Sequence, residues 1–255
     1  MLVDVANASH NTSDKVSRSS ASDGTATKTR DGKSEKSGAK SDSVEKAYKG
    51  NVAIKISTEA EVSAREADID RANFYTSLGA LLAAPATYEH CEALRNLPDI
   101  TEPETSMEIA WSLLRKAAGE HSVEAIDDEY HRLFIGLGRG EVVPYGSWHL
   151  TGFLMEKPLS ALRVDLRKLG FERNADVKES EDHIASLCQA MAAVIMADEI
   201  DFETQLAFFN THIGGWAEDF FKELQNATSA EFYRAVGLLG ESFIGVEKQY
   251  LSMAV

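Results

Sequence analysis

Residues 136–149, G-L-G-R-G-E-V-V-P-Y-G-S-W-H, gather residue types that often do chemistry. The glycines between Gly136 and Gly140 fall at every second position, which is not the G-x-G-x-x-G spacing of a dinucleotide-binding turn. No Lys-Ser or Lys-Thr pair follows them, as a phosphate-binding loop requires. Ser147 and His149 could form a nucleophile and a base, but the G-x-S-x-G pattern of a hydrolase elbow is missing. The segment therefore favours neither phosphate binding nor acyl transfer, and we expect Ser147 to cap a short helix instead.

Carboxylate and imidazole side chains at helical spacing suggest a second chemistry, metal binding. Di-iron helical bundles need carboxylates on two helices and a Glu-x-x-His motif on two more. Asp128 and His131 form one imperfect version, and Glu179 and His183 lie four residues apart, on one face of a helix. Because a second carboxylate-x-x-His pair is missing, we predict no metal site and no catalytic residues. A helical metal-dependent oxidase or hydrolase that uses these four residues stays open as the alternative.

Helices must position these residues, because apolar side chains recur at helical spacing along most of the chain and strand-like alternation is scarce. We therefore predict an all-α fold, a single helical-bundle domain of about seven to nine helices. The predicted helical stripes lie within residues 74–82, 107–114, 123–134, 159–169, 184–195, 209–224 and 232–250.

The first 50 residues differ from the rest of the chain. They contain ten serines, nine basic and seven acidic residues, and Tyr48 is their only aromatic residue. So few apolar groups cannot offset the conformational entropy lost on ordering a chain. We predict a disordered tail at residues 1–55 and a helical domain at residues 56–255.

Charge is concentrated in the helical domain. The chain has 26 basic and 41 acidic residues, which leaves residues 51–255 with 17 basic and 34 acidic residues, a net charge of −17. Such a body repels nucleic acid and anionic membranes and attracts cationic partners. No stretch approaches the roughly 20 apolar residues of a membrane span, and no secretory signal is recognisable. Together with the widely spaced Cys91 and Cys188, which we expect to be buried thiols, these features predict a cytoplasmic protein without stable membrane insertion.

Three short motifs follow one another between residues 129 and 184. They are E-Y-H-R-L-F at 129–134, P-Y-G-S at 144–147 and E-S-E-D-H-I at 179–184, and aromatic residues continue through 208–243. Their order and spacing resemble the TorD/DmsD/NarJ family of chaperones, which mature molybdenum-containing redox enzymes. The resemblance covers about residues 65–250, and Ser180 stands where the family usually has proline.

The resemblance implies an all-helical, non-enzymatic cytoplasmic chaperone. Such a chaperone binds the twin-arginine signal peptide or the immature body of a molybdoenzyme precursor, assists cofactor insertion and delays export until the enzyme is mature. It implies no stoichiometric cofactor, although weak guanine-nucleotide binding is attributed to some members. It leaves the client open, as well as the choice between a monomer and a helix-exchanged dimer. The client-binding residues that it implies are Leu133, Phe134, Pro144, Tyr145, Ser147, Glu181, Asp182 and His183.

The chemistry of a twin-arginine signal peptide agrees with several of these residues. Its apolar core needs aromatic surface, which Tyr145 and Trp148 could supply, and its arginines need carboxylates, which Glu181 and Asp182 could supply. We expect residues 144–147, the Pro–Tyr loop, and residues 179–184, the acidic segment, to form two partly exposed walls of one site. We expect Ser180 to cap a helix that starts in the acidic segment. A helical scaffold without a signal-peptide role remains the third hypothesis.

Overall fold

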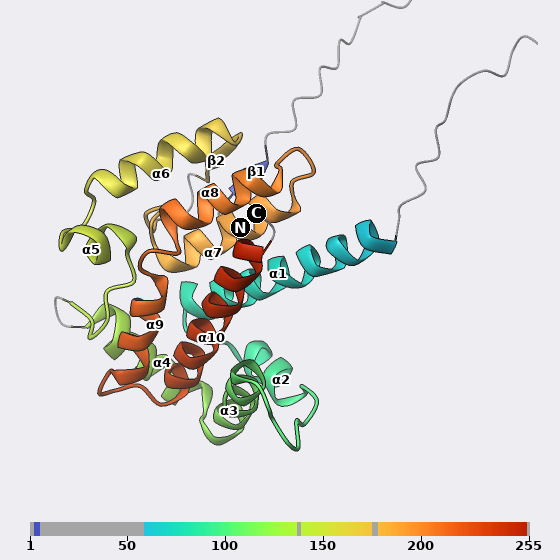
Figure 1. The fold of residues 1–255 in the computed structure, drawn as a ribbon. Coiled ribbons are helices and arrows are strands. Elements are labelled where there is room, and N and C mark those ends of the chain that lie inside the picture. The colour runs from blue at the N-terminus through green and yellow to red at the C-terminus, as the bar shows by residue number, and fades with distance from the viewer. Residues whose placement is uncertain (1–2, 6–58, 137–138, 175–177, 254–255) are drawn as a thin grey trace, which may run out of the picture. The chain divides into compact units, whose positions relative to one another are not determined.

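The computed structural model describes residues 3–5, 59–136, 139–174 and 178–253 (Figure 1). These ranges contain ten α-helices, one π-helix and two three-residue strands. The elements are β1 (Val3–Val5), α1 (Glu59–Ala83), α2 (Tyr88–Arg95), α3 (Ser106–Glu120), α4 (Val123–Tyr130), the π-helix η1 (His131–Ile135), α5 (Gly146–Thr151), α6 (Lys157–Lys168), β2 (Phe171–Arg173), α7 (Ile184–Met196), α8 (Phe202–His212), α9 (Ala217–Asn226) and α10 (Phe232–Met253).

The all-α prediction is confirmed. Several helices begin where a side chain accepts a hydrogen bond from the first turn, as at Thr105, Ser122 and Asp201. None of the helices in the described part of the chain has the length and apolar composition needed to cross a membrane. The predicted tail at residues 1–55 lies outside the described residues except for β1, which pairs antiparallel with β2 between Val3 and Arg173 and between Val5 and Phe171.

Long helices build the core. α1 packs along α7, and α10 packs against α9, α3, α1 and α4 (Figure 1). Their facing sides bury large aromatic residues, including Tyr75, Phe221 and Phe243. Cys91 and Cys188 are buried free thiols, as expected. The shorter helices α5 and α6 pack against each other, and α6 contacts α8.

An ion pair inside this core was not predicted. Arg71 on α1 donates from Nε and Nη2 to the two carboxylate oxygens of Glu247 on α10, over 2.9 and 2.7 Å. Both residues are buried, and the Arg71 guanidinium also lies 4.6 Å from the ring centroid of Tyr250. The pair links α1 to α10. Both charges can be buried because each is held beside its partner.

The structure divides one predicted helix in two. The stripe at 209–224 was predicted as a single helix, and this is wrong, because α8 ends at His212 and α9 begins at Ala217. Gly214 and Gly215 lie between them, and a Cβ atom on Gly214 would come within 2.8 Å of the Phe209 ring. This division, with the short helices α2 and α5, explains why ten α-helices occur where seven to nine were expected.

Candidate functional site

The E-Y motif, at the end of α4, forms hydrogen bonds with the start of α10. Glu129 on α4 is buried, and its carboxylate accepts hydrogen bonds from the backbone N–H groups of residues 231–233, at 2.7–3.0 Å. These N–H groups are at the start of α10 and have no partner within their own helix. The Tyr130 hydroxyl donates to the carbonyl of Leu82, 3.2 Å away. The motif thus holds α10, α4 and α1 together.

The L-F part of the same motif lies in the core. Leu133 is fully buried, and the Phe134 ring packs against Tyr130 and Tyr233, with centroids 4.9 and 5.6 Å away. The glycine loop closes over this turn, because the N–H of Val142 donates to the carbonyl of Leu133, 2.9 Å away. Little of Leu133 is therefore accessible to a client.

Two glycines of this loop lie where the backbone leaves no room for a side chain. Gly136 has a φ of +58°, and a Cβ atom there would lie 2.2 Å from the carbonyl oxygen of Arg139. A Cβ atom on Gly140 would lie 2.3 Å from the carbonyl oxygen of Leu133. The two glycines allow a turn that side chains would block.

The Pro–Tyr loop and the acidic segment lie side by side, as the sequence predicted. Tyr145 and His183 form an antiparallel bridge, flanked by hydrogen bonds from Ile184 N–H to the Pro144 carbonyl and from Gly146 N–H to the Asp182 carbonyl, both 2.8 Å. The rings of Tyr145 and His183 meet edge to face, 5.1 Å apart. Two segments more than 30 residues apart in sequence thus form one unit.

Asp182 occupies the inside of that unit. It was expected to be partly exposed, and this is wrong, because only 3% of the residue is accessible. One carboxylate oxygen accepts the backbone N–H of Ser147 at 2.9 Å, and the other accepts the Ser180 hydroxyl. Asp182 therefore holds the P-Y-G-S loop in place, and both of its carboxylate oxygens accept hydrogen bonds within the chain.

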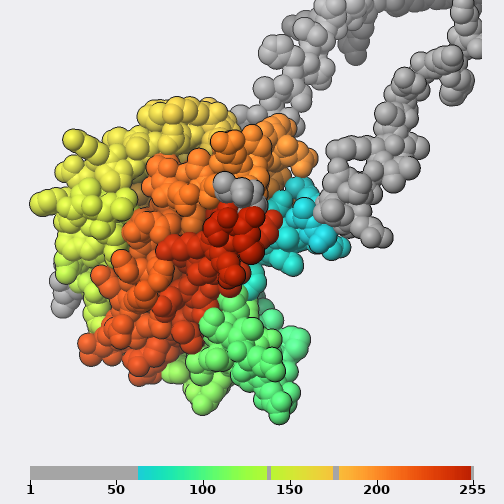
Figure 2. Space-filling model, viewed as in Figure 1, coloured from blue at the N-terminus to red at the C-terminus, as the bar shows by residue number. Residues whose placement is uncertain are grey.

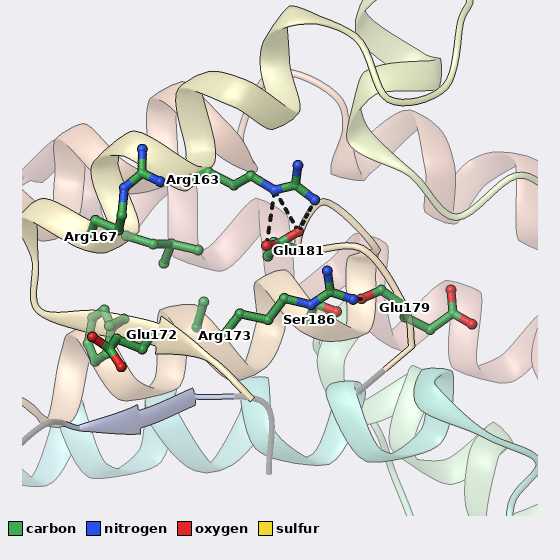
Figure 3. A pocket seen from close by; sticks show the side chains of 10 residues that line it. Arg163, Arg167, Glu172, Arg173, Glu179, Glu181 and Ser186 are labelled. Carbon is green, nitrogen blue, oxygen red and sulfur yellow. Dashed lines mark hydrogen bonds and ion pairs between the residues drawn. The ribbon is translucent and has the colours of Figure 1, made fainter. Parts of the chain in front are cut away.

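Glu181 is also paired within the chain. Arg163 on α6 donates to both of its carboxylate oxygens, at 2.8–3.0 Å (Figure 3). Although burial alone would raise the pKa of Glu181, these bonds keep that pKa below its usual value. The pair borders a pocket of about 280 Å³ at the α6–β2 turn, lined also by Arg167, Arg173 and Glu179. A client arginine would have to compete with Arg163 for Glu181.

His183 begins helix α7. The helix was expected to begin at Ser180, and this is wrong, because His183 is the N-cap and its Nδ1 accepts the N–H of Ala185 at 3.1 Å. Burial lowers the pKa of His183 to about 4, although Glu179 and Asp182 oppose that shift. At neutral pH the ring is therefore uncharged, the form that a cap requires.

Tyr145 remains partly accessible at the edge of the unit. Its hydroxyl donates to Glu179 over 2.5 Å, and burial together with this bond raises the pKa of the phenol. Gly146 beside it packs on the indole of Trp216, where a Cβ atom would lie 3.1 Å from the ring. The Tyr-Gly pair thus fits between the acidic segment and the start of α9.

Ser147 and Trp148 differ in their exposure. Ser147 is fully buried inside α5, whose N-cap is Tyr145, so the predicted capping role for Ser147 is wrong. Its Oγ instead accepts the backbone N–H of Met155, 3.1 Å away. Trp148 is half-buried, with the Arg139 guanidinium 4.9 Å from its ring centroid.

The most exposed apolar residues of this region were not predicted from the sequence. α5 ends at Thr151, because the next residue, Gly152, adopts a left-handed conformation with φ +79°. Leu150, near the end of α5, and the apolar side chains after Gly152 are exposed. The exposed fractions are 45% for Leu150, 68% for Phe153, 50% for Leu154 and 78% for Met155. We call residues 150–155, L-T-G-F-L-M, the apolar loop. The four large apolar residues that follow soon after the P-Y-G-S motif could have indicated this exposed surface.

The four residues of the metal-enzyme alternative do not converge. The Nδ1 atom of His131 lies 2.9 Å from the carbonyl of Asp127, and His183 uses its Nδ1 as a cap. Among the residues that the structure describes, no three His, Cys, Asp or Glu side chains are placed to share a metal ion. The alternative therefore has no ligand geometry in this part of the chain.

Comparisons with known proteins agree with the motifs. The family model described as nitrate reductase delta subunit matches residues 101–222. Proteins named chaperone protein TorD from Aliivibrio fischeri, Aliivibrio salmonicida and Vibrio atlanticus are each 26% identical, over 71% of this chain and 94% of each relative. A crystal structure assigned to redox enzyme maturation in Archaeoglobus fulgidus is 16% identical and covers 69% of this chain and 93% of its own, with a TM-score of 0.44.

The three relatives are named as chaperones, a role that is not enzymatic. The chain is similar to the TorD/DmsD/NarJ family: the family model matches 122 of its 255 residues, and the three relatives share 26% identity with it.

Proposed function

We propose that the protein binds the twin-arginine signal peptide of a molybdenum-containing redox enzyme in the cytoplasm and delays export until the cofactor is inserted. The observation that carries the proposal is the apolar loop. Such a signal peptide has a cationic front and an apolar core, and the loop offers apolar side chains that no helix of the described domain covers.

The apolar loop is held in a defined shape. The Thr151 hydroxyl donates to the Ser147 carbonyl over 2.7 Å and accepts the N–H of Phe153 at 3.2 Å. Ser147 also accepts the N–H of Met155, whose φ is +59°. Because the backbone is fixed before a client arrives, little conformational entropy remains to be lost on binding.

The hydrophobic effect explains why a client would bind there. Covering apolar surface contributes about 25 cal/mol per Å², and a contiguous exposed apolar patch is typical of a protein-interaction site. In the space-filling view, α5 and α6 form an outer surface at the upper left of the molecule (Figure 2). The net charge of −17 in residues 51–255 would draw in the cationic front of the peptide.

The predicted client-binding residues differ in their accessibility. Tyr145 and Trp148 are partly accessible and can contact the peptide. Pro144, Ser147, Asp182 and His183 are buried and hold the surface in shape. Weak guanine-nucleotide binding stays a prediction, and a monomer and a helix-exchanged dimer stay open as alternatives.

Calorimetric titration of the full chain tests the proposal. The probe is a synthetic peptide with two adjacent arginines followed by about 15 apolar residues, the minimum description of such a signal. We expect saturable binding that weakens as salt rises and persists at high salt, because screening affects the charges and spares the apolar contact.

Two peptide variants and one protein variant serve as controls. Replacing the apolar residues of the peptide with serine should abolish binding, and replacing the arginines with glutamine should weaken it. Phe153→Ser should cost about 2 kcal/mol of affinity if Phe153 is an anchor, whereas Val246→Ser, at a 49% exposed position on α10, should cost nothing measurable. The proposal is wrong if the parent chain binds the serine peptide as well as the apolar one.

A further inference from the structure

A groove between α6 and α8 continues from the apolar loop. Two hollows of about 210 and 230 Å³ lie between these helices and share Thr211 and His212 in their linings. The first hollow is bordered by Leu150 and Pro158, and the second by Leu169 and Thr204. The helices run antiparallel, since the start of α6 and the end of α8 border the first hollow, and the end of α6 and the start of α8 border the second.

Small side chains keep this groove open. Ala161 on α6 and Ala207 and Thr211 on α8 line it and are exposed. From Thr204 to Thr211 the groove is about 10 Å long, at 1.5 Å of helix per residue. It can hold one turn or two of a helical peptide, and the apolar loop extends the surface beyond that length. α6 and α8 lie alongside each other with α5 at one end of the pair (Figure 1).

The two ends of the groove differ in chemistry. At the α5 end stand the exposed apolar side chains of the loop, where Glu156 and Lys157 carry opposite charges. At the other end the chain reads D-E-I-D-F-E over residues 198–203, and its four carboxylates are on exposed residues. Glu203 lies four residues before Ala207 and eight before Thr211, which places all three on one face of α8.

Basic residues offset only part of this acidic end. Arg65 contacts Asp198 at 3.2 Å, and Lys168 contacts Asp165 at 2.8 Å. Asp201 caps α8 through the N–H of Thr204. In the described part of the chain neither Glu199 nor Glu203 forms an ion pair with a cation, so this end carries a net negative charge.

We propose that the α6–α8 groove binds the signal peptide in one direction, with its arginines at the start of α8 and its apolar core running toward the apolar loop. This inference rests on the proposed function and adds the location and the orientation of the peptide. An apolar surface with one acidic end complements an apolar segment with one cationic end, and a peptide in the reverse direction would place its arginines beside Phe153 and Met155.

Filling the groove tests its location. Ala207→Trp places a large side chain between the two hollows, and Ala161→Trp does so from the α6 wall. We expect each to weaken binding of the arginine-containing peptide at least tenfold, with an unchanged melting temperature because both positions are exposed. The matched control is Ala93→Trp, at an exposed position on α2, which should bind like the parent chain. If both groove variants bind like the parent, the location is wrong and the proposed function stands. If the parent binds no peptide, the proposed function itself fails.

Reversing one charge tests the orientation. Glu203→Lys should weaken binding of the arginine peptide by about fivefold, the upper range for one exposed ion pair, and binding of the glutamine peptide by less than twofold. Glu92→Lys, exposed on α2, produces the same change in net charge and should affect both peptides equally and weakly. Because an acidic residue at a helix start also stabilises the helix dipole, thermal melts accompany each titration. Equal weakening of both peptides by Glu203→Lys would overturn the orientation.

Discussion

The buried motif cluster of Glu129, Asp182 and His183 and the apolar loop at 150–155 use their side chains in opposite ways. In the motif cluster, polar groups are buried and each accepts hydrogen bonds from backbone N–H groups. In the apolar loop, Phe153 and Met155 are exposed, and the polar groups of the loop are satisfied by Thr151 and Ser147. The residues that carry the family resemblance therefore build the scaffold, and residues beside them offer the surface. Substitutions should separate the two roles.

The largest effect should come from Glu129→Ala. The substitution leaves the N–H groups of Phe232 and Tyr233 buried without acceptors, at about 1–3 kcal/mol each, so the free energy of unfolding should fall by about 2–6 kcal/mol. Glu129→Gln keeps one acceptor oxygen and should lose less. Urea unfolding measures both variants, and an Ala variant as stable as the parent would mean that Glu129 does not support α10.

His183 should make stability depend on pH. Its pKa is about 4 in the folded state and near 6.5 when unfolded, so the unfolded chain binds the proton more tightly. The stabilisation is complete above pH 6.5 and is lost as the pH falls toward 4, by about 3 kcal/mol in total. Protonation would also remove the Nδ1 acceptor that caps α7.

The control for this pH effect is His183→Asn, because asparagine also caps helices. Its unfolding free energy should fall less steeply between pH 6.5 and 4.5 than that of the parent. His212, whose pKa burial also lowers, leaves a residual slope of the same sign. Identical slopes for parent and variant would remove His183 from the explanation.

Asp182→Asn should have an intermediate effect. The amide keeps one acceptor oxygen but loses the charge, which should lower the free energy of unfolding by about 1–2 kcal/mol, since hydrogen bonds to charged groups contribute about 1.5–3 kcal/mol. Peptide affinity, measured well below the melting temperature, should change by less than the stability does. A large loss of affinity at unchanged stability would instead give Asp182 a direct contact with the peptide.

The smallest effect on stability should come from the apolar loop. Phe153→Ser and Leu154→Ser remove exposed side chains, so the free energy of unfolding should stay within about 0.5 kcal/mol of the parent value. Thermal and urea unfolding of both variants provide the measurement. A fall in the free energy of unfolding above 2 kcal/mol would show that the apolar loop packs on the core and is part of the scaffold.

Much of the fold could be predicted from helical periodicity. The stripe at 184–195 is buried along most of its length and corresponds closely to α7, and the stripe at 74–82 stops close to the end of α1 at Ala83. The break between α8 and α9 was missed because the apolar spacing continues from Phe209 through Trp216 while Gly214 and Gly215 interrupt the backbone. Helical periodicity predicts which side chains face the core. It does not predict where a helix ends when the apolar spacing continues into the next helix.

The site could be predicted only in part. The proximity of Tyr145 to His183 followed from the order of the motifs. The burial of Asp182 did not, since an acidic residue near a helix start is usually solvated, and its acceptor role depends on the N–H of Ser147, 35 residues away. The partner of Glu181 could not be predicted either, because Arg163 lies 18 residues earlier, on α6. Contacts between distant residues depend on the packing of whole helices, which residue spacing does not encode.

The bond between Glu129 and the start of α10 also has a consequence for synthesis on the ribosome. The backbone groups that Glu129 accepts belong to residues more than 100 positions later in the chain. While the nascent chain emerges, the carboxylate has no α10 to hold, and the faces of α3 and α9 that α10 covers stay open to water. α10, which is 22 residues long, can cover these faces only after it has left the exit tunnel.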